Sequence, residues 1–293
     1  RWADVLIDFG RELYVPWRIT QGDVPYRDLA VFFGPLSMYI NALWFTVFGT
    51  SFLTLALCNA ALVAVFTSVL YWLLLRVSGA WSATAGCIVW LCVFAFGRLQ
   101  GLANYNFITP YSNELTHGVM LGLLCVIMLV RFVRTGRLIE VFISGVLLGL
   151  VFLTKPEPFV ATCAAIAVGW IGLIGKQSVG PPRHGPAAVA FAVGSIMPPM
   201  IAAALLATAM PLSEALRGTI GSWAYISNKD LHQLPFYRFI MGTSKPGANL
   251  LEMLSWLGRM VLTFAPAFVA AWCGAAARFN TWLWGCGAAL ASA

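Results

Sequence analysis

The chain has 293 residues, of which 60% are hydrophobic and only 10% are charged, and its mean hydropathy is +0.83. Soluble domains carry about 25% charged residues. This composition therefore excludes a soluble globular protein, a disordered chain and a disulfide-stapled secreted module, and predicts an all-α polytopic bundle of transmembrane helices. The chain begins at Arg1 and ends at Ala293 inside an apolar run, so we expect it to be part of a longer protein.

Apolar runs along the chain predict the membrane spans. A helix needs about 20 apolar residues to cross the hydrocarbon core, and continuous rather than alternating runs favour helices over a barrel. The expected spans are 51–75, 80–97, 116–130, 138–154, 158–175, 186–210 and 260–277, with another beginning near 281. Residues 1–50 and 211–259 then form external segments, the first with juxtamembrane helices, and 260–293 holds further spans. The apolar run 32–49 is interpreted as a juxtamembrane helix rather than a crossing.

The net charge of +7 is explained by where the basic residues lie, and does not indicate a nucleic-acid partner. One alternating set of loops is basic and contains a single acid, Glu140. Its members are Arg76, Arg131, Arg134, Arg137, Lys176, Arg183 and Arg278. Short basic loops stay cytoplasmic. The other set, which holds most of the acids, is therefore expected outside, and the chain is expected to be a multi-pass protein of the cell (inner) membrane.

The first external segment contains three acids spaced by four residues, Asp4, Asp8 and Glu12, which would share one face of a helix. Apolar residues at helical spacing fall on the opposite side, namely Leu6, Phe9, Leu13 and Trp17. This pattern predicts an amphipathic helix along the interface, kinked or ended by Pro16. Asp8 and Glu12 form either a solvated polar face or carboxylates that accept a proton from a hydroxyl or hold a cation.

Lys155 and Glu157 lie between two apolar spans, at their external end. Ionisable groups at membrane depth are costly and are usually functional. Lys155 is either a snorkelling side chain paired with Glu157 or a point charge that binds a lipid phosphate.

The external loop 104–114 contains Tyr111 and leads directly into the span that carries His117. Asn113 is positioned to cap that helix. Glu114 favours the helix dipole whether or not it has a further role. His117 is either a packing residue or part of a site.

Several classes of site are absent from the sequence. The seven cysteines lie in apolar spans without a CxxC pair, which indicates buried hydrophobes rather than a metal or disulfide framework. There is no Walker loop, GxGxxG, HExxH or GxSxG motif. The pairs Gly118/Gly122 and Gly145/Gly149 predict close helix packing.

Four short segments carry a resemblance to a known family. They are 8–14 (DFGRELY), 22–28 (GDVPYRD), 34–39 (GPLSMY) and the Phe48-Gly49 pair. Together they resemble the first external loop of GT-C superfamily glycosyltransferases, which include protein O-mannosyltransferases and lipid A aminoarabinose transferases. The Thr154-Lys155-Pro156 segment resembles a later external loop of that family. Phe9 stands where many members have Glu, so Glu12 would supply the second carboxylate.

The resemblance implies a membrane glycosyltransferase, mostly inverting in this family, with a GT-C-like fold. Such an enzyme moves a sugar from a polyprenyl-phosphate carrier to an external lipid, glycan or protein acceptor. Asp8 would be the general base or the residue that positions the acceptor, with Glu12 as a second catalytic carboxylate. The implied substrate-binding residues are Arg11, Arg27, Asp28, Tyr111, Glu114, His117, Lys155 and Glu157. Cations among them would neutralise the departing phosphate. The resemblance establishes no cofactor, and it leaves open whether the enzyme uses a divalent cation.

Three alternatives stay open. A polytopic transporter or lipid flippase would need paired ionisable groups near mid-bilayer and often shows internal repeats, none of which is found in this sequence. A non-catalytic assembly subunit would resemble the enzymes without their activity. A polysaccharide polymerase or ligase would use closely related chemistry.

Overall fold

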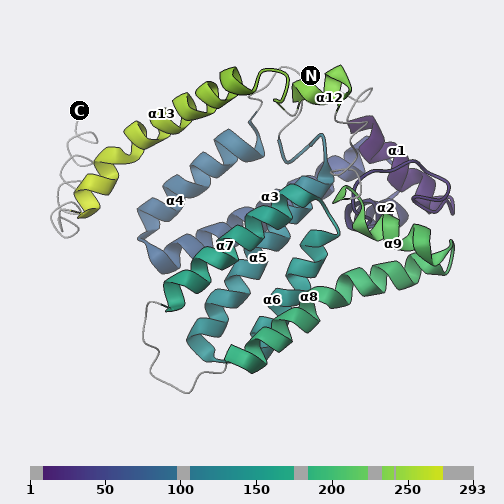
Figure 1. Ribbon diagram of the computed structural model, residues 1–293, viewed down its shortest axis with the longest axis horizontal. Helices are drawn as coiled ribbons and strands as arrows, with labels where there is room; N and C mark the ends of the chain where they lie inside the picture. Colours follow the sequence, from purple (N-terminus) through teal and green to yellow (C-terminus); the bar gives the residue numbers. More distant parts are fainter. Residues whose placement is uncertain (1–8, 98–105, 175–183, 224–232, 241, 273–293) are drawn as a thin grey trace. The chain divides into compact units, whose positions relative to one another are not determined.

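The computed structural model of the protein describes residues 9–97, 106–174, 184–223, 233–240 and 242–272, and every named element within them is a helix (Figure 1). The all-α prediction is therefore confirmed for these residues. The chain divides into two compact units, residues 1–227 and residues 228–293.

The first unit contains most of the helices. They are α1 (Phe9–Thr20), α2 (Leu36–Phe48), α3 (Phe52–Val77), α4 (Ala80–Val89) with the π-helical turn η1 (Trp90–Ala95), α5 (Asn113–Thr135), α6 (Leu138–Phe152), α7 (Pro156–Ile174), α8 (His184–Ala207) and α9 (Leu212–Ile220). The second unit contains α12 (Pro235–Ile240) and α13 (Pro246–Trp272).

Three helices of the described residues are long and apolar enough to cross a membrane, at Phe52–Arg76, Asn113–Thr135 and Gly185–Ala207. They coincide with α3, α5 and α8, and α5 extends into both flanks of the shorter span 116–130. Their outer surfaces are apolar: Val193, Ile196 and Met200 of α8 are all exposed. Such a surface fits lipid rather than water, so the protein is a membrane protein.

Other expected spans correspond to shorter apolar helices, at Ala80–Ala95, Leu138–Phe152 and Pro156–Gly169. The expected span 260–277 overlaps α13, which begins at Pro246 inside the segment expected as the external loop 211–259. A proline is favoured in the first turn of a helix, and an apolar run follows it. The span expected near 281 lies outside the described residues.

The N-terminal segment forms two helices that pack together, α1 and α2. With 13 residues, α2 is about 20 Å long, which is less than the hydrocarbon core of about 30 Å. Pro16 does not end α1, which continues to Thr20. A proline removes only one N–H from the helix, and the buried face of α1 is held by packing on both sides of Pro16.

The expected faces of α1 are corrected by its packing. The buried residues are Phe9, Glu12, Val15 and Pro16, whereas Tyr14 and Trp17 are exposed. Glu12 therefore lies on the packed face with Phe9, and not on a solvated face opposite to it. The helical periodicity of this segment was predicted correctly, but the predicted buried face was not. Which face of α1 is buried depends on the residues from other helices that pack against it.

Close packing at glycines holds the helix bundle together. A Cβ on Gly145 or Gly149 of α6 would overlap the backbone carbonyl of Phe191 or Ser195 in α8. A Cβ on Gly118 or Gly122 of α5 would overlap side chains that include Thr154 and Thr162, before and within α7. The predicted close approach at both glycine pairs is confirmed, and it places the start of α5 against the α6–α7 turn.

Candidate functional site

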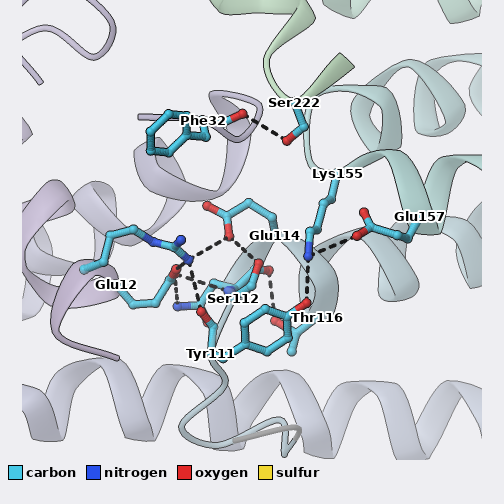
Figure 2. A network of polar contacts seen from close by, with 11 residues as sticks. Glu12, Phe32, Tyr111, Ser112, Glu114, Thr116, Lys155, Glu157 and Ser222 are labelled. Atoms are coloured by element: carbon cyan, nitrogen blue, oxygen red, sulfur yellow. Dashed lines mark hydrogen bonds and ion pairs between the residues drawn. The ribbon is translucent and has the colours of Figure 1, made fainter. Parts of the chain in front are cut away.

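A buried polar cluster lies where α1 meets the first turn of α5 (Figure 2). Glu12 is 4% exposed, and its Oε2 accepts hydrogen bonds from the backbone N–H and the side-chain Nδ2 of Asn113, at 3.2 and 2.7 Å. Its Oε1 lies 2.5 Å from Nη2 of Arg11. Since α5 starts at Asn113, its first N–H has no helical acceptor, and Glu12 supplies one from another helix.

A second buried carboxylate lies beside the first. Glu114 is also 4% exposed, and its Oε2 accepts a 2.6 Å hydrogen bond from Oγ of Ser112. The same Oε2 lies 3.9 Å from Nη2 of Arg11. One guanidinium nitrogen therefore faces both carboxylates, and it also donates to the carbonyl of Tyr111 at 3.0 Å.

This environment makes Glu12 a group that can exchange a proton near neutral pH. Burial, and then the negative charge of Glu114, raise the pKa of Glu12 to about 7, although Arg11 and Asn113 act in the opposite direction. A carboxyl group with such a pKa suits general acid–base chemistry.

Lys155, in the turn before α7, also lies beside the Phe33 ring. Its ammonium group, with Lys155 only 7% exposed, donates to the hydroxyl of Tyr111 at 2.7 Å and lies 3.2 Å from the carboxylate of Glu157. It also lies 4.8 Å from the centroid of the Tyr111 ring. Burial disfavours this charge, but Tyr111 and Glu157 outweigh burial and raise the pKa of Lys155, so it stays a cation.

The Phe33 ring links the two cations. Cζ of Arg11 lies 4.5 Å, and Nζ of Lys155 5.0 Å, from the centroid of this ring. Both distances are within the range of cation–π attraction. The Arg11 guanidinium, from α1, and the Lys155 ammonium, from the turn before α7, therefore both lie next to the same aromatic ring.

The backbone around Phe33 is held from several directions. The N–H groups of Gly34 and Leu36 donate to the carbonyls of Thr154 and Leu153, at 2.9 and 3.1 Å. The Tyr26 hydroxyl donates to the carbonyl of Phe33 at 2.6 Å. Ser222 donates to the carbonyl of Phe32 at 2.9 Å, as Figure 2 shows. The ring position is thus set by rigid neighbours.

A small cavity of about 20 Å³ opens beside this cluster. Its walls include Arg11, Glu12, Phe33, Met38 and Glu114. Its volume is enough for about one water molecule. Any group that enters it meets a cation, two carboxylates and an apolar wall.

The residues expected to bind substrate are only partly brought together. Arg11, Tyr111, Glu114 and Lys155 join Glu12 in the cluster, and Glu157 lies at its exposed edge with 62% of its side chain accessible. His117 lies one turn further along α5, buried, with Nδ1 lacking a hydrogen-bond partner. Asp8 lies outside the described residues.

Arg27 and Asp28 lie outside this cluster, and their expected role in substrate binding stays a prediction. They form an exposed pair at 2.7 Å, Asp28 also accepts from the backbone of Val24, and Arg27 also donates to the carbonyl of Ala209. A tight turn over 24–28 has the N–H of Asp28 bonded to the carbonyl of Val24, and it places Arg27 within reach of the carbonyl of Ala209, just after α8.

Asn113 has a different role from the expected one. The residue before α5 is Ser112, and Asn113 is the first residue of the helix. Its side chain binds Glu12 instead of capping α5. Phe33 and Ser112 were not identified from the sequence, because neither residue type in isolation indicates a site; only their long-range contacts do.

The described residues contain no group of three or more His, Cys, Asp or Glu side chains placed to hold a metal ion. No family model, curated protein or solved structure matches the chain.

Proposed function

We propose that the protein is a membrane glycosyltransferase that moves a sugar from a polyprenyl-phosphate carrier to an acceptor on the non-cytoplasmic side of the cell (inner) membrane. The observation that carries this proposal is that buried carboxylates and buried or half-buried cations lie close together. Two buried carboxylates, Glu12 and Glu114, lie beside Arg11, and Arg11 and Lys155 share the Phe33 ring. Sugar transfer from a lipid phosphate needs a base and an anion site close together.

In the proposed reaction the ionised Glu12 takes the proton of an acceptor hydroxyl. The acceptor oxygen forms a bond to the anomeric carbon while the bond from that carbon to the phosphate oxygen breaks. The electron pair leaves with the polyprenyl phosphate, so the configuration at the carbon is inverted. Lys155 and Arg11 would stabilise the charge that grows on the phosphate. Asp8 remains a candidate for a second base from the resemblance of 8–14.

The acceptor is a lipid, a glycan or a protein. A divalent cation would find oxygen ligands at Glu12 and Glu114, together with the donor phosphate. The effect of EDTA on sugar transfer, with and without added Mg²⁺ or Mn²⁺, tests this part of the proposal directly.

The test of the function is transfer of labelled sugar in proteoliposomes. Decaprenyl-phosphate-linked mannose, glucose and arabinose serve as donors, and a membrane extract supplies acceptors. We expect Glu12→Gln to lower the rate by at least about 100-fold, the scale of a lost general base. Glu140→Gln is the matched control, because Glu140 is equally buried and paired with Arg131, at the opposite end of α5. Equal rates in wild type and Glu12→Gln would contradict the role of Glu12.

A proton-coupled transporter or lipid flippase is a second candidate, favoured by a specific observation. Glu12, Glu114 and His117 are all buried at or beside the membrane helix α5, and buried ionisable groups are typical of proton pathways. Translocation of fluorescent polyprenyl phosphate across proteoliposomes, without transfer of a sugar, would support this candidate against the enzyme.

A further inference from the structure

Unpaired polar atoms are concentrated at one helix interface. Six buried side-chain nitrogen and oxygen atoms of the described residues have no hydrogen-bond partner. Five of them belong to Ser37, Asn41, Asn113 and His117, and both polar atoms of Asn41 are among them. Burying an unpaired polar group is costly, so this concentration needs a physical explanation.

The four residues form two pairs. Ser37 and Asn41 lie four residues apart on α2, and Asn113 and His117 lie four residues apart on α5, so each pair shares one helix face. Helices α2 and α5 pack against each other, and all four side chains are at least 93% buried.

Neighbouring contacts bring the two pairs to the same place. Gly34, just before α2, and Gly118 of α5 both lie against Thr154. Met38, next to Ser37, lines the same cavity as Glu12 and Glu114. Both pairs of residues therefore lie next to elements that also contact the carboxylate cluster.

Among the described residues, Ser37 carries the one buried serine or threonine hydroxyl group without a hydrogen-bond partner. Several helical hydroxyl groups bond to the carbonyl four residues earlier, as in Thr46, Thr67, Ser68, Thr162, Ser195 and Thr219. For Ser37 that carbonyl belongs to Phe33, and it accepts from Tyr26 instead. The hydroxyl of Ser37 is thereby left for another partner.

The hydrogen bond to Glu12 fixes the orientation of the Asn113 side chain. Its Nδ2 donates to Glu12, so its Oδ1 faces away from that carboxylate and is left as an acceptor. The site thus offers a hydroxyl, two carboxamides and an imidazole, all of which are uncharged when His117 is neutral.

We propose that this α2–α5 site binds the hydroxyl groups of a sugar ring, namely the sugar of the donor lipid. This inference rests on the proposed function and adds the residues that would recognise the sugar. A hydroxyl group both donates and accepts, so a polyhydroxylated ring satisfies a mixed set of donors and acceptors without carrying charge. Ordered water has the same chemistry, and the experiment distinguishes the two.

The experiment measures binding of decaprenyl-phosphate mannose, decaprenyl-phosphate glucose and sugar-free decaprenyl phosphate to the full chain in detergent, by calorimetry. Asn41→Leu removes two unpaired atoms at similar volume. We expect it to weaken binding of at least one sugar-linked lipid by 10-fold or more, to leave the sugar-free lipid within 2-fold, and not to lower the melting temperature.

Asn59→Leu is the matched control. Asn59 is equally buried, but its Nδ2 already donates to the carbonyl of Ile108 at 3.0 Å. This substitution should lower the melting temperature and leave the ratio of sugar-linked to sugar-free binding unchanged. Ser37→Ala is a milder second variant, for which we expect about a 3-fold loss for the same sugar-linked lipid.

The possible failures are distinguishable. If sugar-linked and sugar-free lipids bind wild type equally well, and Asn41→Leu and Ser37→Ala change neither, the site holds only water and the inference is overturned while the lipid-phosphate site stands. If wild type binds none of the three lipids, the proposed function fails and the sugar site fails with it.

Discussion

Glu12 and Asn113 are 101 residues apart in the sequence, yet the Glu12 carboxylate accepts both the backbone and the side-chain N–H of Asn113. The contact joins the N-terminal helix α1 to the first turn of the membrane helix α5. It also buries Glu12 and places it beside Glu114, and burial first and the charge of Glu114 second raise the pKa of Glu12.

The pKa of Glu12 predicts how stability depends on pH. Burial and Glu114 raise this pKa from 4.5 to about 7. Between these values the folded state holds a proton that the unfolded state has lost, so the contribution of Glu12 to stability is largest below about pH 4.5 and falls as pH rises through 7, by about 3 kcal/mol. Thermal melts in detergent at pH 5 and pH 7.5 measure this difference.

Glu12→Gln should flatten that dependence, because the titrating group is gone. Glu157→Gln removes an exposed carboxylate and should leave the wild-type curve unchanged. The same pH dependence of stability in wild type and in Glu12→Gln would show that Glu12 does not hold the proton.

Lys155 provides a test of the anion site. Lys155→Met keeps the length of the side chain but removes the charge between the Phe33 and Tyr111 rings. We expect binding of decaprenyl phosphate to weaken by at least about 10-fold, the scale of a lost charged hydrogen bond. Lys155→Arg should retain most of the binding and its sensitivity to salt. Calorimetry measures the dissociation constant of decaprenyl phosphate for each variant. If Lys155→Met binds this lipid as tightly as wild type does, Lys155 does not contribute to the anion site.

Gly34→Ala tests the support of the Phe33 loop. A Cβ at this position would overlap the carbonyl carbon and oxygen of Leu153, both of which are backbone atoms that cannot rotate away. We expect a loss of stability of about 2 kcal/mol or more, typical of overpacking, together with weaker lipid-phosphate binding. Gly79→Ala is the control, since a Cβ at Gly79 would meet open space. Equal melting temperatures in the two variants would contradict the close packing.

Arg27 should be dispensable, although the sequence resemblance included it. Its guanidinium pairs with Asp28 and with the end of α8, and it is exposed. Arg27→Gln should change decaprenyl-phosphate binding by less than about 2-fold, in line with the small effect of surface pairs. A loss comparable to that of Lys155→Met would show that the exposed pair takes part in binding.

The proposed orientation is tested by labelling from the two sides of the membrane. Single cysteines replace Gln21, just after α1, and Arg134, in the last turn of α5, in a variant without the native cysteines. A membrane-impermeant maleimide should label the Gln21→Cys protein in intact cells, and the Arg134→Cys protein only after lysis. Labelling of both from outside would refute the orientation derived from the basic loops.

The sequence by itself determined the kind of protein and the positions of its helices. A chain with 10% charged residues cannot cover a water-facing surface, and the apolar runs predicted α3, α5 and α8 to within a few residues. The glycine pairs of α5 and α6 also predicted contacts, because a missing Cβ marks where two helices approach. These are local properties, and they can be read along one segment at a time.

Only the tertiary structure decided which polar residues meet. The spacing of Asp4, Asp8 and Glu12 left open whether these carboxylates form a solvated face or a site, whereas the structure buries Glu12 against α5. Phe33 acquires its position from two backbone hydrogen bonds to the α6–α7 turn. The burial of a carboxylate and its proton affinity depend on groups contributed by distant segments, and no periodicity within one helix contains that information.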